Sequence, residues 1–483
     1  MRKANKIVTM RGQTLSIPKI VRALQQMLIK ATCLRNDRKW FRKKLNKAKR
    51  HERIGDKKGM RDALLAADNF AQSMRSNPLS FRRNWEKVLS YQLAVFDIPG
   101  AELTAQLARS MKLPDKSALL AGLPEVLSQL AEWRGPLEDA RKDLLGISSP
   151  SENENSLVIF VPSVAMGIDT AQQPGLRCGL RFIFGEIVAA CREADIPFEF
   201  RGRIANHGTP HIAKHRRYIS HHTISQEEGG LHIKATDMPS CFSFDTRGYS
   251  GWSAFSQTPL EDLKLLEPDA SQVEAFFLQL KKRVIGGNIS KYVQSAAVED
   301  VRLPGNYVFL GLQVIDDSVQ ALARISMLDM LEEVANICRE KKLSLVVKRH
   351  PRCGSRKVAR ALAKGVKAGW FQLSEQSIHS LVASSCAVCV VNSSVGAEAL
   401  LHEKPVYVFG EAEYQHVCYP MREKGDFARY LQPNQLPVSQ DILMRFIYVL
   451  RNRYAVNVTE TESARKLIRD HVRRHAHRDA PLA

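Results

Sequence analysis

Two hydrophobic patterns divide the chain. Across residues 63–74 and 103–144, leucine and alanine recur every three or four positions, which is the spacing of an amphipathic helix. Strand-like alternation is absent from this first part. After residue 156 the pattern changes to short apolar runs separated by helical segments. The chain is therefore expected to contain a helical region followed by α/β structure.

The α/β part begins with a predicted series of strand, helix and strand. An apolar strand is expected at 157–161, a helix at about 179–194 and a second strand at 197–202. Residues 206–252 are rich in His, Gly and Ser and are expected to form loops. A helix at 270–283 follows them. This order of elements is typical of a parallel sheet.

A second series of the same kind follows. Strands are predicted at 307–313, 343–348, 370–373, 386–391 and 405–410. Helices are predicted between them at 326–341, 356–367, 378–384 and 393–401. The fold class is therefore expected to be α/β, with two Rossmann-like domains preceded by a basic helical N-terminal region.

The domain boundaries are expected at segments rich in polar and helix-breaking residues. Residues 148–156 read Ser-Ser-Pro-Ser-Glu-Asn-Glu-Asn-Ser, which is typical of a linker. The predicted parts are a basic helical region at 1–147, the linker, an N-terminal Rossmann-like acceptor domain at 157–300, a C-terminal Rossmann-like donor domain at 301–440 and a helical tail at 441–483.

Positive charge is concentrated near the N-terminus. Residues 1–60 hold 19 Lys and Arg but only 3 Asp and Glu, while the whole chain has a net charge of +21. Such a cluster attracts anionic lipid and equally nucleic acid, and it could also be a solvated helix surface. No recognised nucleic-acid motif accompanies it. An anionic membrane surface is therefore the expected partner, and nucleic acid is not.

The compartment follows from the apolar content and the cysteines. No apolar run reaches the roughly 18 residues of a membrane span, and no apolar segment follows the basic N-terminus as in a signal peptide. The nine cysteines are scattered along the chain. A cytoplasmic protein is expected, peripheral at the inner membrane.

Neither cysteine nor carboxylate spacing predicts a metal. Cys386 and Cys389 have CxxC spacing, but they lie in an apolar run without a second ligand pair, which favours two buried thiols over zinc. Asp316 and Asp317 follow a predicted strand and could bind a divalent cation, although adjacent carboxylates more often cap a turn. No metal and no cofactor are expected.

The first candidate motif ends the strand at 343–348. The apolar residues stop at Lys348, Arg349 and His350, which a proline follows. In an open α/β sheet, ligands bind beyond the carboxyl ends of the strands. The two cations could bind a phosphate, and His350 could donate to a leaving phosphate or shuttle a proton. The alternative is a loop histidine without a role.

The second motif ends the strand at 386–391. Asn392, Ser393 and Ser394 open a helix, whose N-terminus favours an anion. The same residues are also ordinary helix caps, and the two roles are compatible. Gly396 would allow close approach of the backbone to a ligand. Glu398 could reach a ribose hydroxyl or could be an exposed helix residue.

The segment 244–253 is the candidate acceptor site of the first domain. Its glycines and aromatic residues, Tyr249 and Trp252 among them, suit a sugar pocket. Asp245 is the candidate base or nucleophile of a glycosyl transfer, with a turn-forming aspartate as the alternative. Residues 220–223 are interpreted as a polar wall of the cleft, and residues 290–292 are expected to line the crevice between the domains.

These motifs resemble a known family. The segments 347–351, 391–401 and 404–410 are similar to those of the capsule polysaccharide biosynthesis and export family, and Gln313 with Asp317-Ser318 adds to the likeness. The resemblance covers about residues 155–430. Two α/β units in series, with the phosphate motifs in the second, also resemble a GT-B glycosyltransferase.

The resemblance implies a donor and a set of binding residues. Members of the family include β-Kdo transferases, which use CMP-Kdo, and the His-Pro and Ser-Ser motifs are similar to those of bacterial sialyltransferases, which use CMP-sialic acid. In those enzymes the histidine and the serines hold the CMP phosphate. The same role is implied for His350, Ser393 and Ser394. The expected donor site also includes Gln313, Lys348, Arg349, Asn392, Gly396 and Glu398.

The sequence thus predicts a glycosyltransferase that moves Kdo or a related acid sugar from a CMP donor onto a capsule polysaccharide or glycolipid. Its partners would be the nucleotide-sugar, the glycan acceptor and, through residues 1–60, an anionic membrane. Three alternatives stay open. They are a non-catalytic assembly or export protein that recognises a glycan, a transferase with another donor such as a UDP-sugar, and a nucleic-acid-binding protein.

Overall fold

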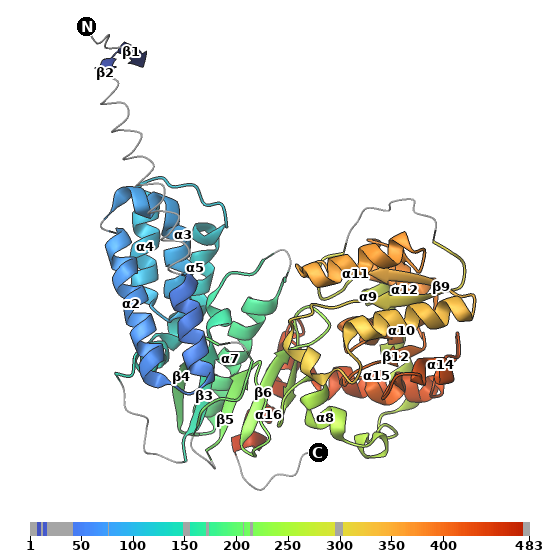
Figure 1. The fold of residues 1–483 in the computed structure, drawn as a ribbon. Helices are drawn as coiled ribbons and strands as arrows, with labels where there is room; N and C mark the ends of the chain where they lie inside the picture. The colour runs from blue at the N-terminus through green and yellow to red at the C-terminus, as the bar shows by residue number, and fades with distance from the viewer. Residues whose placement is uncertain are drawn as a thin grey trace, which may run out of the picture. The chain divides into compact units, whose positions relative to one another are not determined.

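A computed structural model describes residues 7–10, 13–16, 42–75, 77–147, 155–170, 173–205, 207–212, 216–294 and 303–476 (Figure 1). Contacts divide the chain into two compact units. The first contains residues up to 124 together with 137–150, and the second contains residues 125–136 together with 151–483. Most of the predicted linker, 148–154, and the predicted boundary at 300 lie outside the described residues.

The first unit is built mainly of helices. Residues 42–53 are helical, and the helices that follow are α2 (Lys57–Arg75), α3 (Pro78–Ala94), α4 (Ile98–Ser110), α5 (Leu119–Leu130), which crosses into the second unit, and α6 (Arg134–Leu144). Phe81 and Leu89 of α3 are fully buried. Asp68 of α2 accepts from the hydroxyl of Tyr91 at 2.8 Å and pairs with Arg141 at 2.9 Å.

The first unit also contains a hairpin that the helical prediction did not include. Strands β1 (Ile7–Met10) and β2 (Gln13–Ser16) pair antiparallel. The prediction of helix was wrong here because β-branched Ile7, Val8 and Thr9 favour a strand. The run is also too short to carry a helical period.

The second unit begins with a six-stranded mixed sheet, ordered β14-β7-β6-β5-β3-β4. Its strands are β3 (Leu157–Pro162), β4 (Phe198–Arg203), β5 (Tyr218–His221), β6 (Gly230–Ala235), β7 (Cys241–Asp245) and β14 (Ala455–Asn457). The strands from β3 to β6 are parallel, whereas β7 and β14 are antiparallel to their neighbours. Helix α7 (Leu176–Glu193) connects β3 to β4.

Three of these strands fall in the segment that was expected to form loops. Residues 206–252 contain β5, β6 and β7. The prediction was wrong because polar residues occupy buried strand positions, including Ser220, His232 and Ser243. A buried polar side chain interrupts the apolar run by which a central strand is recognised.

The second sheet is entirely parallel, in the order β10-β9-β8-β11-β12-β13. Its strands are β8 (Tyr307–Gly311), β9 (Ser344–Lys348), β10 (Gln372–Leu373), β11 (Ser385–Val390), β12 (Val406–Val408) and β13 (Tyr419–Pro420). Its helices include α10 (Met327–Glu340), α11 (Arg356–Lys367), α12 (Ile378–Ala383), α13 (Ser394–Leu401) and α14 (Asp426–Tyr430). Two apolar cores cover the two faces of the sheet.

The strand order creates a switch point between β8 and β11. The chain runs from β8 to β9 on one side of the sheet, and β11 then pairs with β8 on the other side. At such a point the loops that leave the two carboxyl ends diverge and open a crevice. The predicted fold class, α/β with two Rossmann-like sheets after a helical region, is confirmed.

The end of the chain returns to the first sheet. Helices α8 (Ala254–Gln257) and α9 (Ala270–Gly286) lead out of that sheet, and α15 (Gln440–Asn452) leads back to it. Strand β14 then pairs with β7, so the predicted tail is not helical throughout.

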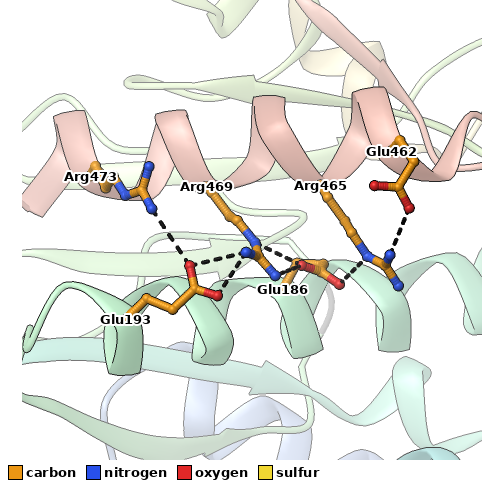
Figure 2. Close-up of polar contacts among 6 residues, drawn as sticks. All are labelled: Glu186, Glu193, Glu462, Arg465, Arg469 and Arg473. Carbon is orange, nitrogen blue, oxygen red and sulfur yellow. Dashed lines mark hydrogen bonds and ion pairs between the residues drawn. The ribbon is translucent and has the colours of Figure 1, made fainter.

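The final helix, α16 (Thr461–Ala476), carries arginines that pair with glutamates of α7 (Figure 2). Glu186 binds Arg465 at 3.0 Å and Arg469 at 2.9 Å, and Glu193 binds Arg469 at 2.7 Å and Arg473 at 3.5 Å. Arg465, Arg469 and Arg473 of the tail therefore attach α16 to α7.

Candidate functional site

One cavity of the second unit collects polar side chains from both sheets. The second sheet and its loops contribute Gln313, Asp317, Ser318, His350, Asn392, Ser393, Ser394, Glu413 and Tyr414. The first sheet and its loops contribute His222, Lys234, Asp237, Tyr249 and Ser250. Of residues 290–292, which were expected to line the crevice, Lys291 and Tyr292 lie in the cavity wall and Ser290 does not. The cavity lies at the switch point between β8 and β11, where an α/β sheet binds its ligands.

His350 follows β9 and lines the cavity, and one of its two ring nitrogens accepts a hydrogen bond from the protein. Its Nδ1 accepts the backbone N–H of Arg352 at 3.1 Å, so the proton of the neutral ring lies on Nε2. The ring of Tyr292 packs edge-on, with 5.1 Å between the centroids. Burial, followed by the charge of Arg352, lowers the pKa of His350. At neutral pH the residue is therefore an uncharged donor through Nε2–H.

Asn392 and Gln313 hold the loops after β11 and β8 together. Gln313 Nε2 donates to Asn392 Oδ1 at 2.8 Å, and the backbone N–H of Asn392 donates to Gln313 Oε1 at 3.3 Å. The side-chain amide of Asn392 also donates to the carbonyl of Val319 at 2.8 Å. Both residues line the cavity, and their amide groups position the serines that follow.

Ser393 is the N-cap of α13. Its hydroxyl accepts the N–H of Val395 at 3.4 Å, and its carbonyl accepts the hydroxyl of Tyr414 at 2.5 Å. A hydroxyl that accepts one hydrogen bond can still donate another. Ser393 and Ser394 therefore present two hydroxyl donors to the cavity.

The structure requires a glycine at position 396 for a reason different from the predicted one. A Cβ at this position would lie 2.5 Å from the ring of Tyr414. The missing side chain thus makes room for Tyr414, and Gly396 is not among the residues that line the cavity. The expectation that a ligand approaches the backbone here is not supported.

Lys348 and Arg349 brace loops and do not line the cavity. Lys348 Nζ donates to the carbonyls of Glu375, at 3.1 Å, and Gln376. Arg349 donates to the carbonyl of Cys353 at 2.7 Å. Neighbouring side chains of a strand point to opposite faces, so three successive residues at its end do not all reach one cavity. Of the three, His350 is the one that lines it.

Asp245 is a structural carboxylate. Its oxygens accept four backbone N–H groups at 2.7–3.2 Å, from Arg247, Gly248, Ala254 and Phe255. The residue is 5% exposed and does not line the cavity. The alternative reading, a turn-forming aspartate in a structured loop, therefore fits better than a catalytic base or nucleophile.

Of the two aromatic residues predicted for the acceptor site, one lines the cavity and the other does not. Tyr249 lines the cavity, and its hydroxyl lies 3.1 Å from Ser318 Oγ and 2.7 Å from His207 Nδ1. Trp252 packs against Tyr249, with 5.4 Å between the ring centroids, and does not line the cavity. Trp252 therefore supports the position of Tyr249.

Glu398 is neither an exposed helix residue nor part of the cavity wall. It is 2% exposed, and its carboxylate accepts the hydroxyl of Ser290 at 2.8 Å. Burial raises its pKa to about 8, and the hydrogen bond from Ser290 opposes this shift. The predicted contact with a ribose is not supported.

Lys234 is a cavity residue that the sequence reasoning missed. It lies on β6, with Nζ 5.2 Å from the centre of the Tyr249 ring. Burial, and next the charge of Lys291, lower its pKa to about 7. The available signal was a single cation that follows Leu231, His232 and Ile233 in a short, mostly apolar run.

The charged side chains of the cavity wall differ in the groups that bind them. Arg451 and Asp237 form a two-pronged ion pair at 2.6 and 2.5 Å. Glu413 accepts the backbone N–H of Ser250 at 2.8 Å, and burial raises its pKa. Asp317 follows β8 and lines the cavity, whereas its neighbour Asp316 does not.

The described residues provide no arrangement of three or more His, Cys, Asp or Glu side chains that could hold a metal ion. Cys386 and Cys389 are buried in β11, and burial raises the pKa of the Cys389 thiol well above its ordinary value. None of the helices in the described part of the chain is long and apolar enough to cross a membrane.

Comparison with known proteins identifies a family for part of the chain. Residues 278–419 match the profile of a family described as capsule polysaccharide biosynthesis protein. This segment contains both His350 and the serines of α13. The resemblance to that family, expected over about residues 155–430, is confirmed for residues 278–419. A search of curated proteins found no match.

Solved structures also resemble the chain at low identity. The β-Kdo 2,4 transferase of KpsC from Thermosulfurimonas dismutans is 13% identical, with 66% of this chain and 99% of that chain covered and a TM-score of 0.41. The β-Kdo 2,7 transferase of the same protein is 14% identical, with 66% and 98% covered and a TM-score of 0.37. A UDP-GlcNAc 2-epimerase of Methanocaldococcus jannaschii is 10% identical, with 61% and 98% covered and a TM-score of 0.25.

Proposed function

We propose that this protein is a glycosyltransferase of capsule synthesis that transfers Kdo or a related acid sugar from a CMP donor to a glycan or glycolipid. One observation carries the proposal. His350 and the Ser393–Ser394 pair leave different strand ends and reach the same cavity at the switch point of the second sheet. Three neutral donors grouped in this way suit a phosphate diester, which bears a single negative charge.

The donors would act most strongly on the leaving group. In the transfer, the acceptor oxygen bonds to the anomeric carbon while the bond from that carbon to the phosphate oxygen breaks, and CMP leaves with the electron pair. Hydrogen bonds from His350 Nε2–H and the two serine hydroxyls strengthen as charge grows on the phosphate, which lowers the barrier. This mechanism requires no metal ion.

The acceptor must also lose a proton. Asp245 is unsuited to remove it because backbone N–H groups occupy its oxygens. Among the described residues that line the cavity, the carboxylates without an arginine partner are Asp317 and Glu413. Glu413, whose pKa is raised by burial, is the better matched general base.

The basic helices of the first unit are proposed to hold the enzyme at the cytoplasmic face of the inner membrane. Exposed cations on residues 42–58 are Arg42, Lys43, Lys47, Arg50, Arg53, Lys57 and Lys58. Anionic lipid attracts such residues by roughly 1 kcal/mol each. This placement would keep the enzyme near a lipid-linked acceptor.

The experiment that tests the function is nucleotide binding by calorimetry. CMP, UMP, UDP and GDP are compared on the wild-type protein, His350→Ala and Ser393→Ala/Ser394→Ala. Selective CMP binding that both variants weaken supports a CMP-sugar transferase, and CMP release from CMP-Kdo would then be measured. Selective binding of UDP or GDP would indicate a UDP-sugar or GDP-sugar as the donor in place of a CMP-sugar. A folded protein that binds no nucleotide would favour a glycan-recognition role in assembly or export.

A further inference from the structure

Two lysines line the cavity without a direct ion-pair partner among the described residues. Lys234 comes from β6 and Lys291 follows α9. Within the described ranges, neither amine has an ion pair within 4 Å or a hydrogen bond. Arg451, the third cation at this wall, is by contrast held by both oxygens of Asp237.

Each lysine lies near an aromatic residue of the cavity wall. Lys234 Nζ is 5.2 Å from the centre of the Tyr249 ring, and the Tyr249 hydroxyl is 3.1 Å from Ser318 Oγ. Lys291 directly precedes Tyr292, whose ring packs edge-on against His350 at 5.1 Å. Both lysines therefore line the cavity that the serines of α13 also line, Lys234 from β6 of the first sheet and Lys291 from the segment after α9.

An unpaired ammonium surrounded by protein is unfavourable because it has lost part of its hydration. The cost is visible at Lys234, since burial and the neighbouring Lys291 lower its pKa to about 7 even though Asp317 and Glu413 oppose the shift. A bound anion would restore the lost stabilisation. The cavity is therefore expected to receive an anionic group at this wall.

The phosphate of the donor does not account for this second anion. A sugar–CMP diester carries one negative charge, and His350, Ser393 and Ser394 already offer it three donors on the second sheet. Lys234 comes from the other sheet. A ligand held by its phosphate at α13 and extending towards β6 must carry a further negative group to meet the two cations.

We propose that Lys234 and Lys291 form a subsite for the carboxylate of the transferred sugar and so select acid sugars over neutral ones. This inference rests on the proposed function and names the residues that determine the sugar class. Lys234 and Lys291 act as specificity residues, while His350 and the serines hold the phosphate.

The test compares the affinities for CMP and freshly prepared CMP-Kdo by calorimetry without an acceptor. Wild type is expected to bind CMP-Kdo more tightly than CMP. In Lys234→Met and Lys291→Met, affinity for CMP-Kdo should fall at least tenfold while affinity for CMP stays within about twofold. Lys282→Met, an exposed position on α9, is the matched control and should change neither affinity.

Further variants separate the possible outcomes. Lys234→Arg retains the charge and should recover most of the preference for CMP-Kdo, which loss of packing alone would not allow. Equal losses for CMP and CMP-Kdo in the methionine variants would assign the lysines to the phosphate and overturn the subsite. Unchanged CMP-Kdo affinity would overturn it too. If wild type binds neither compound, the proposed function itself fails.

Discussion

Gln313 and Asn392 hold each other across the switch point of the second sheet. The amide of Gln313 donates to Asn392 Oδ1 at 2.8 Å, and its oxygen accepts the backbone N–H of Asn392 at 3.3 Å. Since β8 and β11 are neighbours and their following loops diverge, this pair fixes the distance between the loop after β8 and the start of α13. The serines of the proposed phosphate site follow directly.

Replacing Gln313 by Leu should destabilise the protein and weaken nucleotide binding together. The substitution leaves a buried N–H and a buried amide oxygen of Asn392 without their partner, at a cost of about 1–3 kcal/mol. Thermal unfolding would show a lower Tm, and CMP affinity would fall because Ser393 is no longer held. Gln272→Leu, at an exposed position on α9, is the control. An unchanged CMP affinity in Gln313→Leu would contradict the positioning role.

His350 is expected to act as a neutral donor. His350→Ala should lower the rate of CMP release from the donor about 100-fold or more, the usual effect of removing a donor that stabilises a developing anion. His350→Gln offers an amide N–H and should recover part of the rate. Because burial lowers the pKa of His350, CMP affinity should stay constant from pH 7 to 8.5. A CMP affinity that declines across this interval and depends on His350 would show that the charged ring is required.

Affinity for the acid-sugar donor should have a different pH dependence from affinity for CMP. The pKa of Lys234 is about 7, and the groups that act on it are Lys291, Asp317 and Glu413. The amine is charged below this pKa and neutral above it, so CMP-Kdo should bind less tightly as pH rises from 6.5 to 8.5. In Lys234→Arg the charge persists and the decline should disappear. Parallel pH profiles for CMP and CMP-Kdo would rule out the subsite.

Stability should depend on pH through Glu398. Its pKa is raised to about 8 in the folded protein, so between its ordinary value of 4.5 and about 8 the folded state binds more protons than the unfolded state. The contribution of Glu398 to the free energy of unfolding is therefore fully present below pH 4.5 and is lost as pH rises towards 8. Glu398→Gln, which cannot ionise, should have a flatter profile of Tm between pH 5 and 8.5. Glu332→Gln on the exposed face of α10 should keep the wild-type profile. Identical profiles for Glu398→Gln and wild type would show that Glu398 is ionised throughout.

Local sequence patterns predicted most strands of the second sheet and the strand ends beside which the cavity lies. An apolar run that stops at polar residues marks a strand end, and this located His350, Asn392 and Ser393 beside the cavity. The same pattern could not decide between successive residues, because side-chain direction alternates along a strand. Lys348 and Arg349 therefore turned out to bind loop carbonyls.

Other features depend on partners that are distant in the sequence. The sequence suggests Asp245 as a base, but backbone N–H groups of the following loop occupy its carboxylate oxygens. Lys234 was missed because nothing near it in the sequence indicates that β6 borders the cavity. Buried polar residues such as His232 likewise concealed β6 as a strand, since they are stable only through contacts, here with Thr223 at 2.7 Å, that the fold creates.

The contact between α16 and α7 provides a further prediction. Glu186 is 12% exposed in its side chain and binds both Arg465 and Arg469 (Figure 2). A double-mutant cycle of Glu186→Gln and Arg469→Met should therefore give a coupling free energy of about 0.5–3 kcal/mol, above the value usual for exposed pairs. The Lys264 and Glu267 pair, exposed on both sides and 3.6 Å apart, is the matched comparison and should couple weakly. If the Glu186 cycle gives no coupling in thermal unfolding, apolar packing rather than the ion pairs holds the final helix against α7.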